Sequence, residues 1–224
     1  MGAYLYHMLA NEIERLMLSK FSRGFTLVEL VIAMTIIGIL AALGVPNFRT
    51  WLANTQARTV AEALQNDLRK AQAEAVRLNR QVALVLTNST PNTGNISSTP
   101  AGTARNWVLY SLPLLNSDEG VASTAGTSTL IQTYIQNAGS TTTVTGTSTI
   151  CFSSLGRLVT QSTSIADAGN ATCTAPTNTA PLNFNVQNSI GDRPLRIQVN
   201  LGGQIRMCDP SKDLSSHPDG CTAT

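Results

Sequence analysis

A single carboxylate, Glu29, lies near the start of a largely apolar run from Phe25 to Val45. At about 1.5 Å per residue, this run of 21 residues would form a helix of roughly 30 Å, which matches the hydrocarbon core of a bilayer. An acidic side chain inside a membrane costs about 2.5 kcal/mol or more, so such a residue is expected to have a partner and a function. The run therefore predicts a transmembrane helix in which Glu29 makes a functional contact.

Catalytic machinery is hard to find in the rest of the chain. Beyond residue 24 the single histidine is His217, in a Ser-Ser-His-Pro-Asp segment, so a nucleophile would lack a convincing base. Asp209, Asp213 and Asp219 in the same tail could offer oxygen ligands to Ca²⁺, but their spacing matches no EF-hand-type loop. We therefore predict no enzyme activity, no cofactor and no metal site.

The four cysteines, Cys151, Cys173, Cys208 and Cys221, all follow the apolar run, and none is paired at a C-x-x-C spacing. In an oxidising compartment they can form two disulfides, in any of three connectivities. Proximity in the sequence favours Cys151 with Cys173 and Cys208 with Cys221. A zinc site is the competing interpretation, but isolated cysteines without clustered histidines do not favour it.

Composition and charge describe an exported domain behind a membrane segment. The formal net charge is +2 over 224 residues, so no general attraction to nucleic acid or to a membrane surface follows. Arg15, Lys20 and Arg23 precede the apolar run, which places that end in the cytoplasm. Roughly 180 residues follow the run, enough for one domain with its own core. Their richness in Ser, Thr, Asn and Gly is typical of exported β-rich domains.

Beyond Pro46, apolar residues recur at three- and four-residue steps, which predicts one face of an amphipathic helix. The members of this stripe are Leu52, Val60, Ala63, Leu64, Leu68, Ala71, Ala75 and Leu78. Two oppositely charged pairs stand at i,i+4 spacing on the other side: Arg58 with Glu62, and Lys70 with Glu74. We expect one long helix that reaches about Arg80, kinks near Pro46 and lays its stripe against a globular domain.

Downstream of the helix, short alternating or β-branched runs predict strands. They are residues 82–86, 107–112, 129–135, 143–152, 157–161, 182–187 and 195–201. A hairpin turn at Gly202-Gly203 and a short final strand follow, before a polar tail that contains Cys208 and Cys221. The intervening segments, rich in turn formers, predict surface loops.

The segment around Glu29 resembles the prepilin-type N-terminus of type IV pilins and type II secretion pseudopilins. The matching residues are Gly24, Phe25, Thr26, Leu27, Glu29 and Pro46. The resemblance implies that a prepilin peptidase cuts after Gly24 and that the new N-terminal residue, Phe25, is N-methylated. It also implies that Glu29 pairs with the terminal amine of a neighbouring subunit. The alternative is an ordinary signal anchor in which Glu29 snorkels to the interface; a cleaved secretory signal has a shorter apolar core.

The same resemblance implies an α+β pilin fold, in which the long N-terminal helix packs on an antiparallel β-sheet domain. The expected parts are a leader (1–24), a transmembrane half of the helix (25–46), an amphipathic half (47–81) and a β-rich periplasmic domain (82–224). Met17 is an alternative start to Met1 and would leave the short leader MLSKFSRG. The expected location is the inner membrane, crossed once, followed by entry into a pilus or pseudopilus.

Three further segments resemble the group that contains pseudopilin H and the FimT and FimU minor pilins. Gly156-Arg157 behind Phe152 resembles an F-x-x-x-G-R feature, and residues 69–75 resemble an L-x-x-A-R-x-E-A helical segment with Gln72 where arginine is usual. Asn106-Trp107-Val108 resembles the aromatic start of a strand in that group. The resemblance implies a minor pilin that is incorporated into the fibre or initiates it. A type II secretion pseudopilin is one alternative.

A DNA-binding minor pilin is the second alternative. FimT-like proteins bind DNA through a C-terminal Gly-Arg-x-Arg motif, and here the stretch 203–206 reads Gly-Gln-Ile-Arg. Losing one of two clustered cations should weaken phosphate binding. The candidate DNA contacts are Arg193, Arg196, Arg206 and Lys212, with Asp192, Asp209 and Asp213 among them. Double-stranded DNA thus joins other pilins, the prepilin peptidase and the inner-membrane assembly platform as a candidate partner.

Overall fold

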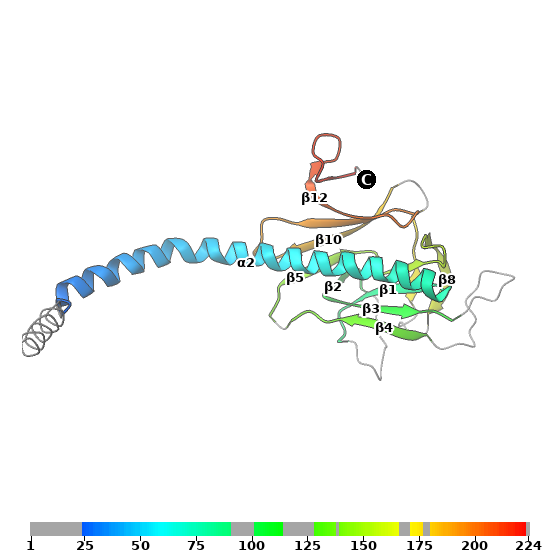
Figure 1. The fold of residues 1–224 in the computed structure, drawn as a ribbon, viewed down its shortest axis with the longest axis horizontal. Helices are drawn as coiled ribbons and strands as arrows, with labels where there is room; N and C mark the ends of the chain where they lie inside the picture. The colour runs from blue at the N-terminus through cyan, green and yellow to red at the C-terminus, as the bar shows by residue number, and fades with distance from the viewer. Residues whose placement is uncertain are drawn as a thin grey trace, which may run out of the picture. The chain divides into compact units, whose positions relative to one another are not determined.

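The computed structural model describes residues 24–90, 101–113, 128–137, 139–165, 171–176 and 180–222. The leader before Gly24, with both candidate start residues, lies outside the described residues. The chain divides into two compact units, and the second is Asn47–Thr224. One helix, α2 (Leu27–Leu78), begins in the first unit and ends in the second (Figure 1).

The first unit contains the N-terminal stretch of α2. Thr26 caps the helix, because its hydroxyl accepts a hydrogen bond from the backbone N–H of Glu29 at 3.2 Å. The large apolar side chains that follow are between 48% (Val45) and 80% (Leu27) exposed. The helix is long and apolar enough to cross a membrane. This stretch is therefore as apolar as a protein core, but no other part of the described chain covers its side chains.

The second stretch of α2 buries one face. The side chains at 4% exposure or less are Ala53, Ala57, Val60, Ala61, Leu64, Leu68, Ala71 and Ala75. Their spacing confirms most of the predicted stripe, but Ala63 and Leu78 are only half-buried and Leu52 is 43% exposed. The helix ends at Leu78, close to the expected Arg80, because Asn79 adopts a left-handed conformation with φ of 51°.

One of the two charge pairs predicted on α2 forms. Arg58 and Glu62 are 2.8 Å apart, as expected for i,i+4 partners. The prediction of a Lys70–Glu74 ion pair is wrong. Lys70 donates to the side chain of Gln132 on a neighbouring strand, and Glu74 pairs with Arg77 at 2.7 Å. Lys70 is thus used in a tertiary contact between α2 and β4, and Glu74 stays paired within the helix.

Among the described residues the strands form two main sheets (Figure 1). The first has the order β4 (Thr129–Tyr134), β3 (Asn106–Ser111), β1 (Val82–Thr87), β6 (Thr149–Phe152), β7 (Leu158–Val159). The second has the order β13 (Gly220–Cys221), β12 (Ile205–Asp213), β11 (Leu195–Val199), β10 (Leu182–Asn188), β5 (Thr142–Gly146), β2 (Thr103–Ala104). β8 (Gln161–Ile165) pairs with β9 (Ala171–Cys173). The pairing is antiparallel apart from β12 with β13, so the predicted α+β class is confirmed.

The predicted strand 143–152 is wrong as a single element. It is two strands, β5 and β6, which belong to different sheets. Gly146 ends β5, where an added Cβ would lie 2.6 Å from the carbonyl oxygen of Asn183 on β10. The chain then crosses to the first sheet, and Leu86 of β1 donates its N–H to the carbonyl of Ser148. The sequence did not indicate this change of sheet, because the Thr-rich run has a high β propensity on both sides of it.

Other strand boundaries also differ from the expectation. The predicted strand 157–161 is divided between β7 and the start of β8, and the expected loop behind it contains β8 and β9. The expected short final strand is the nine-residue β12. The turn at Gly202-Gly203 is confirmed, since Gly203 donates its N–H to the carbonyl of Asn200 at 2.8 Å. The Pro, Asp and Ser content of β12 had indicated a tail rather than a strand.

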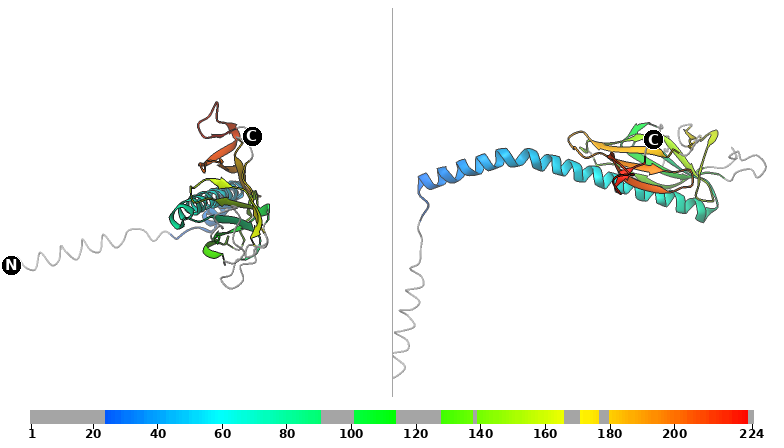
Figure 2. Two further views of the ribbon diagram at one scale, coloured as in Figure 1. Left: turned by 90° about the vertical axis from the view of Figure 1, so that its right-hand side faces the viewer. Right: turned by 90° about the horizontal axis from the view of Figure 1, so that it is seen from above.

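The core lies between α2 and both sheets. Alternate residues of β1 divide between two clusters: Val82, Leu84 and Leu86 pack with the α2 stripe, while Ala83 and Val85 face the opposite side. Figure 2 shows the later part of α2 running along the strands. Each fully buried leucine contributes about 1.5–3 kcal/mol relative to an exposed one. The two sheets therefore bury one face of this half of α2, and the α2 stripe forms part of a core shared with both sheets.

Candidate functional site

The start of α2 presents the predicted processing and assembly residues to the outside. A Cβ added at Gly24 would meet nothing within 4 Å, so the fold itself does not require glycine there. Phe25 is 79% exposed. Glu29 lies in the first helical turn, where a carboxylate is favoured by the helix dipole. No described basic side chain forms an ion pair with Glu29, so its predicted partner has to come from outside this part of the chain.

Pro46 lies within α2, and the helix is continuous through this position. Proline has no N–H, so one backbone hydrogen bond of the helix cannot form there. The boundary between the two units falls directly behind it. The kink at Pro46 stays a prediction.

Three of the four candidate DNA contacts have partners within the fold. Arg196 Nε donates to Asn185 Oδ1 at 2.7 Å, and Arg206 Nη2 donates to the carbonyl of Pro218 at 2.6 Å. Lys212 Nζ lies 2.5 Å from Asp219 and 3.6 Å from Asp209. Each cation would have to exchange these contacts for a phosphate, which lowers the gain from binding DNA.

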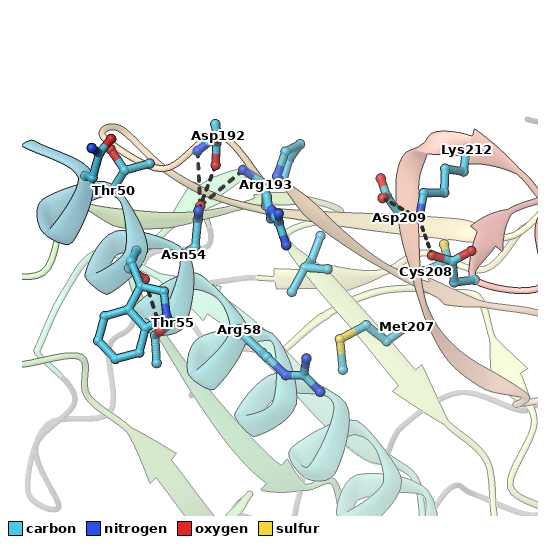
Figure 3. Close-up of a pocket in the computed structure, with 15 residues that line it drawn as sticks. Thr50, Asn54, Thr55, Arg58, Asp192, Arg193, Met207, Cys208, Asp209 and Lys212 are labelled. Carbon is cyan, nitrogen blue, oxygen red and sulfur yellow. Dashed lines mark hydrogen bonds and ion pairs between the residues drawn. The ribbon is translucent and has the colours of Figure 1, made fainter.

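Arg193, the fourth candidate, lines a groove of about 930 Å³ between α2 and the later strands (Figure 3). The groove also contains Lys212 but not Arg196 or Arg206, so the structure brings together two of the four. Its charged lining residues are Arg58, Arg193 and Lys212, with Asp192, Asp209 and Asp219. This mixture of signs does not make the single-sign surface that a phosphate backbone prefers.

One helix side chain, Asn54, builds the groove wall by holding the loop between β10 and β11. Its Oδ1 accepts from the backbone N–H groups of Asp192 and Arg193 at 3.1 and 3.2 Å, and its Nδ2 donates to Asp192 Oδ1 at 2.7 Å (Figure 3). A Cβ at Gly191 would lie 2.7 Å from Asn54 Oδ1, so the loop needs glycine for this approach. Sequence reasoning missed Asn54, because a polar residue on an amphipathic helix carries no signal of a distant partner.

The acidic side chains of the C-terminal tail have hydrogen-bond and ion-pair partners within the tail itself. Hydrogen bonds from Ser211 lower the pKa of Asp209, with a smaller contribution from Lys212. The Lys212 ammonium lowers the pKa of Asp219, and Asp219 in turn raises the pKa of Lys212. The N–H of Ser215 lowers the pKa of Asp213. Within the described chain no three side chains of the metal-binding types gather into one group.

A second junction joins features that the sequence showed separately. Gln72 Nε2 donates to the carbonyl oxygens of Gly156 at 2.7 Å and Gly203 at 3.0 Å. Both glycines have positive φ, 73° and 88°. One α2 side chain therefore holds the turn behind β6 and the turn between β11 and β12. Gln72 stands where the family pattern has arginine, and its neutral amide suffices for two carbonyl acceptors.

Trp107, at the predicted aromatic strand, belongs to a buried polar network. Its Nε1 donates to Asp67 Oδ2 at 2.7 Å, and Gln132 Nε2 donates to Asp67 Oδ1 at 2.8 Å. The ring of Tyr134 stacks on Trp107 with centroids 3.9 Å apart. Burial, and then the charge of Asp67, raise the pKa of Tyr134. The network fixes α2 on the first sheet without using a salt bridge.

The structure contains two disulfides, Cys151–Cys173 and Cys208–Cys221, the pairs that sequence proximity favours. Cys151 and Cys173 belong to the buried cluster on the far side of the first sheet. The other disulfide closes the tail that begins within β12. Both therefore lie in the β-rich part of the chain.

Comparison with known proteins identifies both parts of the chain. Residues 60–203 match the family of the type II transport protein GspH, and residues 19–45 match the prokaryotic N-terminal methylation motif. A fimbrial protein of Pseudomonas aeruginosa is 50% identical over 44 residues, which are 19% of this chain and 29% of that protein. The type IV major fimbrial protein FimA of Dichelobacter nodosus is 30% identical over 111 residues, 46% of this chain and 70% of FimA.

Among solved structures, the type IV minor pilin FimU of Pseudomonas aeruginosa aligns with 71% of this chain and 92% of its own, at 15% identity and a TM-score of 0.43. The family match alone covers more than half of the chain, and it includes the buried stripe of α2 from Val60 onward, the first main sheet, and the second main sheet except β12 and β13. Membership of this family means that the protein is not an enzyme, because pilin-like proteins are structural. The chain therefore belongs to the GspH family of type IV pilin-like proteins and carries the N-terminal methylation motif of that class.

Proposed function

We propose that the chain is a minor pilin of a type IV pilus, which enters or initiates the fibre after cleavage behind Gly24 and N-methylation of Phe25. The observation that carries the proposal is Glu29, a carboxylate in an apolar stretch of helix whose large apolar side chains are exposed in the described chain. The match to the methylation motif over residues 19–45 supports the processing step.

The role of Glu29 follows from electrostatics in a medium of low dielectric constant. A carboxylate and an ammonium attract each other far more strongly there than in water. Removing one partner leaves an uncompensated charge, which is strongly unfavourable. The amine of Phe25 that cleavage creates on a neighbouring subunit is a suitable partner for Glu29. Their pairing would neutralise both charges and set the axial register of the incoming subunit.

The apolar stretch of α2 gives the chain two successive environments. Before assembly it would lie in the inner membrane, with the β-rich unit in the periplasm, because basic residues precede the run. There it would meet the prepilin peptidase and the assembly platform. In the fibre, the helices of other pilins would replace lipid around the same exposed side chains.

A second candidate is a minor pseudopilin of a type II secretion system. The family match favours it, because the family takes its name from a type II transport protein. Deleting the gene separates the two: loss of surface pili with normal secretion supports the pilus, and the reverse supports the pseudopilus.

Glu29→Ala tests the assembly contact itself. We expect normal cleavage, seen as the size shift of the precursor, and loss of most incorporation into sheared fibres. Thr35→Ala is the matched control in the same stretch, since the Thr35 hydroxyl bonds only back to the carbonyl of Ile32. Normal incorporation of Glu29→Ala would contradict the proposed role.

A further inference from the structure

Two aromatic side chains at the start of the second unit are exposed although they are large and apolar. Phe48 is 61% and Trp51 is 60% exposed, and their ring centroids lie 5.7 Å apart. Both lie on α2, one helical turn apart, so they share a face. The buried stripe begins just beyond them, at Ala53. This pair belongs neither to the core of the β-rich unit nor to the apolar run.

The sequence around the pair has a consistent sign of charge. Residues 47–61 contain Arg49 and Arg58 and no acidic residue. Arg58 is paired with Glu62, whereas Arg49 is exposed and forms no ion pair with a described residue. An exposed cation thus lies at the same level of the helix as the two exposed aromatic rings, on a different face.

The distance along the chain fits the headgroup layer of a bilayer. Phe48 and Trp51 follow Val45, the end of the apolar run, by three and six residues. Helical residues rise about 1.5 Å each, and the headgroup layer is about 5–7 Å thick on each side. Tryptophan and other amphipathic rings concentrate at this depth, and cations there meet lipid phosphates.

We propose that Phe48, Arg49 and Trp51 form an interfacial anchor that lies in the phospholipid headgroup layer and fixes the depth of the chain before assembly. The anchor rests on the proposed membrane insertion of the apolar run. A hydrophobic run alone defines its depth loosely, because apolar residues can slide within the hydrocarbon core. Two rings and a cation at one edge define a single preferred position.

Tryptophan fluorescence of the full chain in phosphatidylcholine vesicles tests this depth. The lipids carry bromine atoms either high on the acyl chains or near their ends. We expect Trp51 to be quenched more by the shallow bromines than by the deep ones. Trp107 has 0% exposure and lies in the core of the β-rich unit, so it serves as an internal reference. Trp51→Phe should remove the quenching and leave the Trp107 emission.

The alternative is that the pair only contacts another subunit in the fibre. Wild-type protein that floats with the vesicles, yet is quenched no more than Trp51→Phe, would overturn the anchor and leave the proposed function standing. Protein that does not float would overturn both. Phe48→Ala/Arg49→Ala keeps the Trp51 reporter and should change the ratio of shallow to deep quenching. Leu155→Ala, at an 80% exposed residue of the β-rich unit, should not change it; equal ratios in all three proteins would overturn the anchoring role.

Discussion

The two stretches of α2 differ in apolar content and in their surroundings. From Leu27 to Val45 the large apolar side chains are exposed on every face. From Ala53 to Ala75 one face is fully buried against two sheets, while charged residues such as Arg58 occupy the other. The first stretch is apolar all round, as in a helix surrounded by lipid or other helices, and the second is amphipathic.

The difference shows where each stretch obtains its partner. The second is stabilised by its own chain, through Leu64 and Leu68 in the core and through polar contacts of Asn54, Asp67 and Gln72. The large apolar side chains of the first stretch are exposed in the described chain, and we expect the membrane or other subunits to cover them. Substitutions in the second stretch should therefore act on folding, and those in the first on insertion and assembly.

The largest expected contrast compares one leucine from each stretch. Leu68→Ala opens a cavity at a residue of 0% exposure and should lower the free energy of unfolding by about 2–5 kcal/mol. Leu40→Ala, at 64% exposure, should change it by less than about 0.5 kcal/mol. Urea unfolding in detergent, followed by near-ultraviolet circular dichroism, measures both. Equal losses would break the distinction between the two stretches.

The tail disulfide tests how far the stability of the second unit depends on the chain beyond the core. Cys208 and Cys221 are 13 residues apart, and a loop of this size is worth about 3 kcal/mol when cross-linked. Cys208→Ser/Cys221→Ser should lower the free energy of unfolding by about 3 kcal/mol, which urea unfolding measures as a lower midpoint concentration. Fibre entry should fall only as far as the folded population falls. Unchanged stability would show that β12 and β13 hold the tail without the cross-link.

A smaller effect is expected at the turn that Gln72 holds. Gly203→Ala would place a Cβ 2.1 Å from the carbonyl oxygen of Gly156 in a backbone with φ of 88°, and should cost about 1–3 kcal/mol. Gly202→Ala is the matched control, because a Cβ there meets nothing within 4 Å. Thermal unfolding compares the two. Similar values would show that α2 does not depend on this junction.

The smallest effect concerns pH and the tail carboxylates. The pKa values of Asp209 and Asp219 are lowered in the fold, by Ser211 and Lys212 respectively, so their contribution is present above the ordinary carboxyl range. It is lost as the pH falls below about 4, through the lowered values. The raised pKa of Lys212 adds a contribution that is lost only in strong alkali. Carboxyl titration by NMR should show that Ser211→Ala raises the pKa of Asp209.

Much of this architecture could be predicted from local pattern. The helix from the capping residue Thr26 to Leu78 follows from its apolar periods, and the strands at 82–87, 106–111 and 182–188 follow from β-branched and aromatic runs. The sequence did not indicate that β5 and β6 enter different sheets, because a crossing depends on the close approach at Gly146. It did not indicate β12 either, whose proline and acidic residues resemble a loop.

The candidate sites divide in the same way. Glu29, Gly24 and Phe25 could be identified as candidates from the sequence alone. Glu29 is a charged residue within an apolar run, and Gly24 and Phe25 belong to the short motif around it. The basic residues were also visible in the sequence, but their availability was not: tertiary contacts show that Arg196, Arg206 and Lys212 already have partners. A formal charge can be read from one residue, whereas its availability depends on neighbours brought from distant parts of the chain.

Composition and short spacing are enough to indicate the membrane-length helix and the processing motif, and to predict a partner for Glu29. Contacts between distant parts of the chain were needed to show that one amide, Gln72, holds two turns and that Asn54 shapes the groove. Such contacts join residues 84 to 139 positions apart. They depend on the packing of the hydrophobic stripe, which holds the helix against the sheets.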